Sequence, residues 1–434
     1  MPNPAPRRRA GVPPPGRPLA GRGPTTTVEE AFRREAGAAV ATVARLTGDI
    51  GRAEDAVQEA FALALRRWPT QGVPDRPGAW ITTVARNRAL DVLRREGTRA
   101  DREAEATRSA VASLEASPPI LHPVVDDQLR LVFTCCHPAL PREAHVELTL
   151  KLVCGLRVPE IARALLRGEE AVGKRIQRAK AKVRTAGIPL RVPPPELLDE
   201  RLPSVLDCTY LTFTEGYAAT AGDALIRHEL CDEGIRLARL VVAVLPGRAG
   251  AEALLALLLL HDARRSARLD AAGDIVLLAD QDRSRWDAGR VAEGMAWLER
   301  ASAHAEITAA EAAYLFQAAI AAEHSTAPSW AATDWAAIVS HYDRLAEVNP
   351  SPAVALNRAV AVSYADGPAV ALPLLDALAD DPRLARSHRL AVARADALRR
   401  LDRTADARAA YAQALALGPT APERRHIERL LTTL

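Results

Sequence analysis

Two places in the sequence combine side chains that could bind a metal ion or act as nucleophiles. The first is the pair Cys135 and Cys136, which His137 follows directly. Adjacent cysteines are poorly placed to chelate one zinc ion, and no second CxxC or HxxxH motif supplies the missing ligands. Because free cysteine is among the most often buried residue types, we interpret the pair as structural.

The second place is the C-terminal half, where the string HELCD begins at His228. It shares its first two residues with the HExxH zinc motif, but the second histidine is absent. His261 and Asp262 follow an apolar run and are either buried polar partners or part of a pocket. The chain has no GxGxxG, GxxxxGK[ST] or GxSxG motif. We therefore expect no catalytic residue, no metal and no cofactor, and we do not expect an enzyme.

Nucleic-acid binding has a stronger signal, a run of cations. Seven basic residues and no acidic one lie between Lys174 and Arg191. The whole chain carries 57 basic and 54 acidic residues in 434, so its net charge alone indicates no partner. A local basic patch is the electrostatic footprint of nucleic-acid binding. The alternative is a solvated helix face, but such faces usually carry acidic partners that this run lacks.

The residues around the basic run predict a helix-turn-helix. An apolar helix ends at Gly155, and Pro159 stands where a first helical turn tolerates proline. Gly168 makes the turn into a long basic helix. This second helix of the helix-turn-helix would enter the major groove of DNA. The inward face of that helix is expected to hold Val172, Ile176, Ala179 and Val183.

Further upstream, an acidic amphipathic helix precedes a basic one. In AEDAVQEAFALALRRWP the polar residues share one face, and Val57, Phe61 and Leu65 recur on the core side. In GAWITTVARNRALDVLRRE an apolar stripe leaves arginines elsewhere on the helix, and Asn87 and Asp91 share one exposed face. This order suits a protein that binds another protein with one helix and DNA with the next.

These segments resemble bacterial sigma factors of the extracytoplasmic-function (ECF) type. The family pattern A-E-D-x-x-Q-E-x-F, followed by W-[IL]-x-x-[VI]-A-x-N-x-x-x-D-x-x-R, is that of sigma region 2, and the helix-turn-helix resembles region 4. The stretch YLTFTEGY resembles the Y-L-x-F-N-E-G-Y of one ECF subgroup, with Thr214 in place of Asn. FTCCHPAL is also typical of that subgroup, whose members carry a C-terminal domain similar to tetratricopeptide repeats.

The resemblance implies three sets of site residues. Binding to the RNA polymerase core is implied for Asp49, Glu54, Asp55, Gln58 and Glu59. Recognition of the promoter −10 element is implied for Trp80, Arg86, Asn87, Arg88, Asp91, Arg94 and Arg95. Recognition of the −35 element is implied for Glu169, Glu170, Gly173, Lys174, Arg175, Arg178 and Lys182.

The recognition helix departs from the family pattern in two respects. Ser or Thr often begins it, whereas this chain has Glu169 and Glu170, whose carboxylates repel phosphate and must face bases or solvent. Gly173 lies inside the helix, where glycine costs roughly 0.5–1 kcal/mol relative to alanine. A close approach to DNA could justify it, and so could drift.

The C-terminal half contains an internal repeat. Helical blocks end at Pro350, Pro382 and Pro419, with spacings of 32 and 37 residues, near the roughly 34-residue tetratricopeptide period. Such units bury their apolar faces only by stacking, which predicts an α-solenoid. The stretch from Tyr210 to about Arg300 lacks a clean repeat and is expected to be a helical cap or irregular hairpins.

Together these observations predict an all-α, multidomain transcription factor. The expected parts are a disordered basic tail (1–27), sigma region 2 (28–96), a flexible linker (97–125), sigma region 4 (126–190), a Pro-rich junction (191–209) and the repeat domain (210–434). The chain has few cysteines, and no apolar run approaches the roughly 20 residues that a membrane span needs. Both observations predict a cytoplasmic protein without membrane contact.

The expected partners are RNA polymerase core and promoter DNA. We expect the repeat domain to regulate the sigma part in cis, and its shape is suited to binding a protein or peptide partner. Two alternatives stay open. One is a DNA-binding repeat scaffold that acts without polymerase, and the other is a sigma-like protein whose C-terminal half binds or converts a small ligand.

Overall fold

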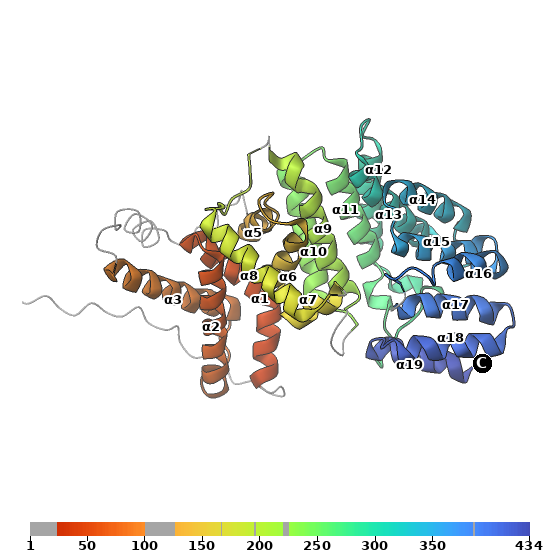
Figure 1. The fold of residues 1–434 in the computed structure, drawn as a ribbon, viewed down its shortest axis with the longest axis horizontal. Helices are drawn as coiled ribbons and strands as arrows, with labels where there is room; N and C mark the ends of the chain where they lie inside the picture. Colours follow the sequence, from red (N-terminus) through yellow and green to blue (C-terminus); the bar gives the residue numbers. More distant parts are fainter. Residues whose placement is uncertain (1–23, 100–125, 166, 195–196, 220–224, 385–386) are drawn as a thin grey trace, which may run out of the picture. The chain divides into compact units, whose positions relative to one another are not determined.

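The computed structural model describes residues 24–99, 126–165, 167–194, 197–219, 225–384 and 387–434. The chain divides into two compact units, unit 1 (Met1–Cys208) and unit 2 (Thr209–Leu434). The elements of both units are shown in Figure 1. Within the described ranges, extended backbone pairs only at an isolated bridge between Leu269 and Ile275. The all-α fold class is therefore confirmed.

Unit 1 begins with three packed helices. They are α1 (Pro24–Thr47), α2 (Ile50–Gln71) and α3 (Pro77–Arg99). Helix α1 starts inside the expected tail and α3 extends past residue 96, while the rest of the tail and residues 100–125 of the linker lie outside the described residues. Two edge-to-face ring pairs fix the packing, Phe32 with Phe61 at 4.9 Å and Trp68 with Trp80 at 5.6 Å between centroids.

The second part of unit 1 is the expected helix-turn-helix. Its helices are α5 (Asp127–Cys135), α6 (Arg142–Leu152), α7 (Val158–Ala164) and α8 (Glu169–Thr185). Gly155 adopts a φ of 66° just after α6, Pro159 lies in the first turn of α7, and Gly168 caps α8. The inward face predicted for α8 is confirmed, since all four of its apolar residues are buried.

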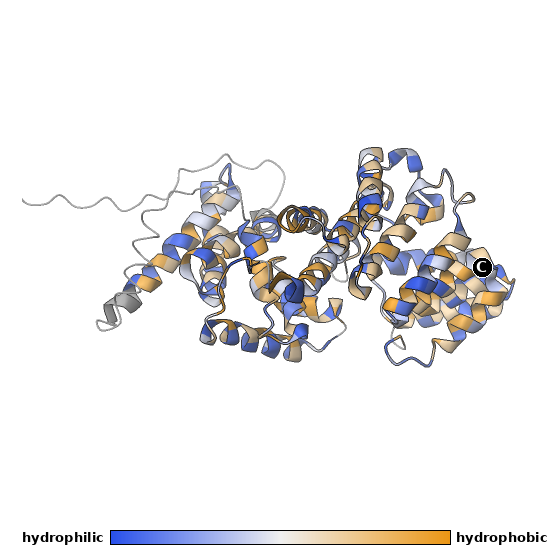
Figure 2. Cartoon of the chain, turned by 90° about the horizontal axis from the view of Figure 1, so that it is seen from above, coloured by the Kyte–Doolittle hydropathy of each residue, from blue (hydrophilic) through white to orange (hydrophobic). Residues whose placement is uncertain are grey.

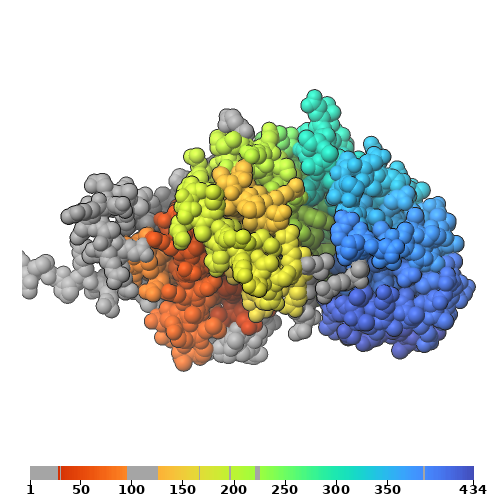
Figure 3. Space-filling model, viewed as in Figure 1, coloured from red at the N-terminus to blue at the C-terminus, as the bar shows by residue number. Residues whose placement is uncertain are grey.

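The two parts of unit 1 pack directly against each other. Helix α1 lies against α5 and α6, and α2 lies against α8; Figure 3 shows the surface of α5–α8 directly beside that of α1–α3. At Gly37 of α1 a Cβ atom would overlap the carbonyl oxygen of Val153, so this close approach requires glycine. An ion pair joins Arg45 of α1 to Asp127 of α5 at 2.9 Å.

Helix α9 (Leu198–Tyr217) runs through the division between the units. Residues 198–209 of the expected Pro-rich junction are therefore helical, with Pro203 inside the helix. Leu202, Val205 and Leu206 are buried, and this burial holds the helix together where proline lacks an N–H.

Unit 2 consists of helices that pack mainly on their neighbours in sequence. The first, α10 and α11, are followed by three short 3₁₀ turns and then by α12 and α13. Helix α11 is buried from Ala249 to Leu260 and contacts α10, α12 and α13. Their bounds are α10 (His228–Val244), α11 (Ala249–Asp262), η2 (Arg265–Ala267), η3 (Leu278–Asp280), η4 (Arg283–Arg285), α12 (Ala288–Ser302) and α13 (Ala309–Thr326).

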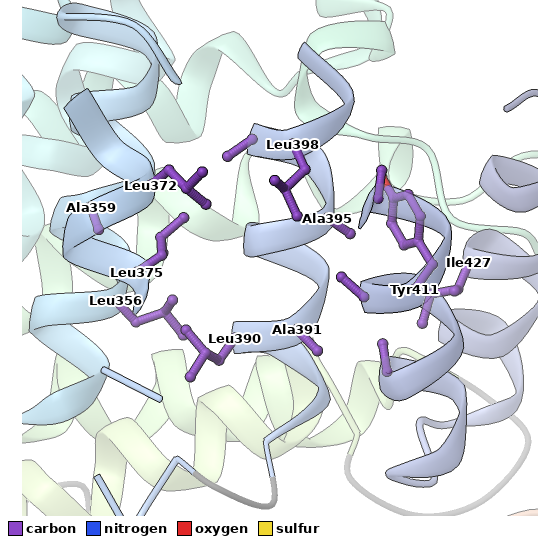
Figure 4. Close-up of a cluster of buried hydrophobic side chains, with 14 of the residues drawn as sticks. Leu356, Ala359, Leu372, Leu375, Leu390, Ala391, Ala395, Leu398, Tyr411 and Ile427 are labelled. Carbon is purple, nitrogen blue, oxygen red and sulfur yellow. The ribbon is translucent and has the colours of Figure 1, made fainter. Parts of the chain in front are cut away.

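The remaining helices form the predicted stack of hairpins. Their bounds are α14 (Trp335–Val348), α15 (Pro352–Ala365), α16 (Pro368–Ala377), α17 (His388–Arg400), α18 (Thr404–Ala416) and α19 (Ala421–Thr432). Leucines and alanines from α15 to α18 meet in one core around Tyr411, with Ile427 of α19 at its end (Figure 4). Figure 2 shows the apolar and polar stripes that this stacking requires. In the described residues, no helix is both long and apolar enough to cross a membrane.

Candidate nucleic-acid interface

Helix α8 presents a polar face to solvent because its opposite face is buried against α6 and α7. A shallow hollow on this face is lined by Glu170, Gly173, Lys174 and Arg178, together with Gln177. A Cβ atom added at Gly173 would meet only Val158, at 3.8 Å. Packing inside the protein therefore does not require glycine at this position. Of the residues expected to read the −35 element, the structure exposes Glu169, Glu170, Lys174, Arg178 and Lys182.

The expectation that the basic run has no acidic partners is wrong. Arg175 donates two hydrogen bonds to Glu147 of α6, from Nε at 2.9 Å and from Nη2 at 2.6 Å. The Glu147 side chain is 0% exposed and also accepts a hydrogen bond from Arg167 at 3.2 Å. The hydrogen bond with Glu147 raises the pKa of Arg175. Arg175 therefore holds α8 on α6, and a role in direct base reading would require it to leave a buried carboxylate.

Two further cations of the run are paired. Lys174 contacts Glu170 one turn earlier on the same exposed face, and Lys180 contacts Glu54 of α2. Arg178 and Lys182 are exposed and form no ion pair with any carboxylate in the described part of the chain. The partners all come from outside the run, at sequence separations of 4, 28 and 126 residues, and the two distant pairs form only in the folded chain.

Helix α3 places the residues expected to read the −10 element on two different sides. Trp80 is 5% exposed and packs on Trp68, so it positions the helix from inside. Asn87, Asp91 and Arg94 are exposed. Arg94 lies 3.8 Å from Asp91, and Arg86 is half-buried. The side chain of Arg95 lies outside the described residues.

Arg88 of α3 is bound to Glu59 of α2, and this hydrogen bond raises the pKa of Arg88. The pair joins a residue expected to bind DNA to one expected to bind polymerase. Because both side chains are solvent-accessible, the pair contributes little to stability and can exchange partners easily.

The acidic face of α2 separates into exposed and internal members. Asp55, Gln58 and Glu59 are exposed. The carboxylate of Asp49 caps α2, accepting hydrogen bonds from the backbone N–H groups of Gly51 at 2.8 Å and of Arg52 at 3.1 Å.

Glu54 is the internal member, 6% exposed. It is bound by Lys180 of α8, by Lys151 of α6 at 3.4 Å and by the Gln58 amide at 3.0 Å. A residue expected to contact polymerase is therefore enclosed by the helix-turn-helix. Nothing local in the sequence points to Lys151 or Lys180 as its partners, because the contact forms only when the two parts of unit 1 pack together.

The cysteines of FTCCHPAL are structural in the fold. Cys135 and Cys136 are buried, and burial raises the pKa of both thiols, which keeps them protonated and poor nucleophiles. Cys136 lies 3.7 Å from Cys208 of α9, sulfur to sulfur. His145 of α6 also contacts α9, through a hydrogen bond between its Nδ1 and the Oγ of Ser204 at 3.1 Å.

The polar residues singled out in unit 2 also have internal partners. Asp232 and Asp262 both pair with Arg265, at 2.8 and 3.0 Å, and Cys231 is buried. In the part of the chain that is described, no three His, Cys, Asp or Glu side chains gather as metal ligands would. Asp262 is thus a buried ion-pair partner, while His261 belongs to a different cluster considered below.

Comparison with known proteins agrees with this geometry. The family model for sigma-70 region 2 matches residues 31–99, and that for sigma-70 region 4 matches residues 130–183. A third model, a family of unknown function named DUF6596, matches residues 201–302. No solved structure matches.

Two relatives cover different parts of the chain. Uncharacterized protein R00370 of Rhizobium meliloti (strain 1021) is 39% identical over an alignment of 409 residues that covers 91% of this chain and 93% of the relative. Probable ECF RNA polymerase sigma factor SigI of Mycobacterium tuberculosis is 30% identical over 169 residues, 38% of this chain and 58% of that protein. With regions 2 and 4 both matched in order and a full-length relative of the same extent, the chain belongs to the ECF-like sigma factors that carry a helical C-terminal extension.

Proposed function

We propose that this protein binds RNA polymerase core in the cytoplasm and directs transcription from specific promoters, and that its C-terminal helical domain regulates it in cis. The observation that supports this most is the pairing of two DNA-reading helices, α3 and α8, each with an exposed polar face and a buried apolar one. No step of this function requires catalysis by the chain itself.

In this proposal α8 enters the major groove at the −35 element. Arg178 and Lys182, which are exposed and unpaired with carboxylates in the described residues, contact phosphates, and these contacts position the helix without specifying sequence. Lys174 and Glu170 lie one turn apart near the start of the helix, where the side chains reach base edges. Gly173 between them lets the DNA approach closely.

At the −10 element, α3 supplies Asn87, Asp91 and Arg94 from its exposed face. A DNA strand opened at this element would contact this surface through its base edges and its phosphate backbone. On the polymerase side, Asp55, Gln58 and Glu59 of α2 form the exposed polar surface, with Glu59 paired to Arg88.

In unit 1 the two DNA-reading helices lie too close together to reach both promoter elements at once. The −10 and −35 elements lie roughly 25 base pairs apart, which is about 85 Å of straight duplex. Helix α2 packs on α3 and contacts α8 through Glu54 and Lys180, so the DNA-reading surfaces of α3 and α8 cannot span that distance. The 26 residues between Arg99 and Asp126 can reach about 90 Å when extended, which is enough for the two parts to separate. We therefore propose that polymerase binding requires opening of the α1–α6 and α2–α8 contacts.

The test of polymerase binding uses a charge reversal at Asp55, which is exposed on α2. Asp55→Lys is expected to weaken retention of the protein by core polymerase, while the control Asp75→Lys, an exposed acid in the α2–α3 loop, is expected to leave it unchanged. Circular dichroism checks that both variants fold. DNA binding without any retention by core polymerase would favour a scaffold regulator that acts without polymerase.

The test of regulation in cis must keep α9 attached to unit 1. A chain cut near Arg191 would strip the first half of α9 from unit 1, breaking the contacts of Ser204 and Cys208 and exposing a core. A specific protease site placed at residues 220–224 leaves α9 whole and joined to unit 1, and the protein is cut only after it has folded. Because Phe213 and Gly216 of α9 pack on α10, circular dichroism must show that the fragment carrying unit 1 stays folded after the two fragments are separated. A change in transcription on cleavage supports regulation, raised activity indicating masking and lost activity a required contact. Equal activity before and after cleavage and separation of the fragments contradicts regulation in cis.

A further inference from the structure

Unit 2 contains a group of basic side chains that no part of the proposed function uses. They are His261 near the end of α11, Arg264 and Arg268 just after it, Arg283 of η4 and His324 near the end of α13. Each is half-buried, so the group reaches solvent along part of its extent. We call these five residues the basic cluster.

The basic cluster has no acidic counterpart in the described residues. Arg264 contacts the ring of His261 at 3.1 Å from Nη2, and neither Arg264, Arg268 nor Arg283 forms an ion pair with a described carboxylate. This differs from the rest of unit 2, where arginines such as Arg265 and Arg290 are paired with aspartates.

Burial and the neighbouring cations both lower the pKa values of the two histidines. Burial, followed by Arg264, Arg268 and His324, lowers the pKa of His261 well below its usual range. Burial, followed by Arg264 and Arg283, lowers the pKa of His324 to about 4. Burial is the larger cause of both shifts, and the neighbouring cations add to it.

Aromatic rings continue the basic cluster on both sides. Tyr217 at the end of α9 lies 5.5 Å from the His261 ring, with the Arg268 guanidinium 3.8 Å above its own ring. His324 contacts Trp335 at 5.3 Å, and Trp335 stacks on Tyr364 of α15 at 4.6 Å. The result is a row of flat side chains across the ends of α9, α11, α13 and α15, which are alternate helices of the stack.

Helix capping explains only part of this arrangement. Arg268 donates to the carbonyl of Tyr217, and Arg283 donates from Nη1 to the carbonyls of His324 and Ala327, both at 2.8 Å. Three polar atoms of the region are left over. Arg283 Nη2, His324 Nδ1 and Tyr217 Oη are buried polar atoms without a hydrogen-bond partner. Buried polar groups are almost always satisfied, so the N–H of Arg283 Nη2, the hydroxyl of Tyr217 and the ring nitrogen of His324 indicate a missing polar partner. The Arg283 guanidinium also lies over the Trp286 ring, 4.4 Å from its centroid.

We propose that the basic cluster and its rings bind a small organic anion, a carboxylate or phosphate attached to a flat ring. Guanidinium groups bind both anions through paired N–H donors, and the ring of Trp335 supplies flat apolar surface for the rest of the ligand. The Tyr217 ring stacks on Phe213 and lies under the Arg268 guanidinium, so it positions that cation. A small ligand fits the cluster, since its cations come from the end of α11, the segment that follows it, η4 and α13.

Binding is tested on the full-length protein with phenyl phosphate and benzoate as probes, by calorimetry and by tryptophan fluorescence. We expect both probes to bind, benzyl alcohol to fail as the neutral control, and inorganic phosphate to bind more weakly than phenyl phosphate. The Trp335→Phe variant should reduce the fluorescence response and so place the site. Equal binding of benzyl alcohol, or no binding of either anion, would overturn the proposal.

The charge requirement is tested by Arg264→Gln with Arg268→Gln, which should weaken phenyl phosphate binding at least about tenfold. The matched control is Arg344→Gln, which removes a similar arginine over the ring of Phe316, outside the cluster. Arg264→Gln alone changes no backbone cap and serves if the double variant does not fold. Unchanged binding in a folded Arg264→Gln variant contradicts the assignment, as does stronger competition by a synthetic acidic peptide than by phenyl phosphate.

Discussion

Removing the two lysines that enclose Glu54 should open unit 1. In the double variant Lys151→Met, Lys180→Met, the buried Glu54 loses both of its cations. Methionine keeps most of the aliphatic volume, so the change is chiefly one of charge. The closed packing of α2 on α8 then holds an unpaired buried carboxylate, whereas in the open state that carboxylate is hydrated.

The size of the effect follows from the burial of the pair. Removing one side of a fully buried ion pair costs about 3–5 kcal/mol. Here the lysine side chains are 18% and 14% exposed, so water partly replaces them, and we expect about 2–3 kcal/mol. That corresponds to roughly a 30- to 150-fold shift of the closed–open equilibrium toward the open state.

Hydrogen exchange and core-polymerase affinity measure this shift together. The double variant should exchange faster at the facing parts of α1, α2, α6 and α8 and should bind core polymerase more tightly, since less free energy is spent on opening. Adding Glu54→Gln should return exchange toward the wild-type rate, because the unpaired charge is gone. The control Arg184→Met changes an exposed cation of α8 and should have no effect. Unchanged exchange and affinity in the double variant, or the same change in Arg184→Met, would refute the reasoning.

Three further outcomes are expected. Gly173→Ala should stabilise the protein by roughly 0.5–1 kcal/mol, because its Cβ has space, and should weaken −35 binding; stronger DNA binding would show that close approach is not needed. Arg178→Ala should lower DNA affinity and reduce the salt slope by about 1 with the fold intact, whereas Arg175→Ala should lower the melting temperature because it leaves Glu147 poorly paired; melting curves with a salt series of binding measurements separate the two. Because the pKa of His324 is lowered to about 4 from 6.5, the unfolded chain takes up this proton first, and unit 2 should lose stability between about pH 6.5 and 4 by roughly 3 kcal/mol. Denaturant unfolding against pH checks this, and a His324→Asn variant with the same pH slope would contradict it.

The elements of the fold could be predicted because their signals are local. The inward face of α8 follows from apolar residues at helical spacing, and Gly155, Pro159 and Gly168 mark helix ends through backbone geometry. The hairpins of unit 2 follow from their repeat period, since each pair must stack on the next.

The contacts of the site could not be predicted, because they depend on packing between distant segments. Arg175 was expected to reach DNA, yet its partner Glu147 lies on another helix. Glu54 was expected on a polymerase-binding surface, yet it is bound by Lys151 and Lys180. A list of charges along the chain contains no information on which pairs meet.

The basic cluster of unit 2 shows the same limit. His261 could be singled out by its place after an apolar run, with a buried partner or a pocket both open. The arginines that surround it lie in the loop after α11 and in η4, where neither periodicity nor a motif distinguishes them from solvated charges.

The most direct test of the central claim is transcription reconstituted from purified parts. Core polymerase, the full-length protein and DNA from upstream of its own gene should give a discrete transcript that core polymerase alone does not make. Changes in the DNA at the −10 or −35 element should remove it, as should the Asp55→Lys variant. A protein that binds this DNA but yields no promoter-dependent transcript with any amount of core polymerase, before or after cleavage at residues 220–224, would contradict the account.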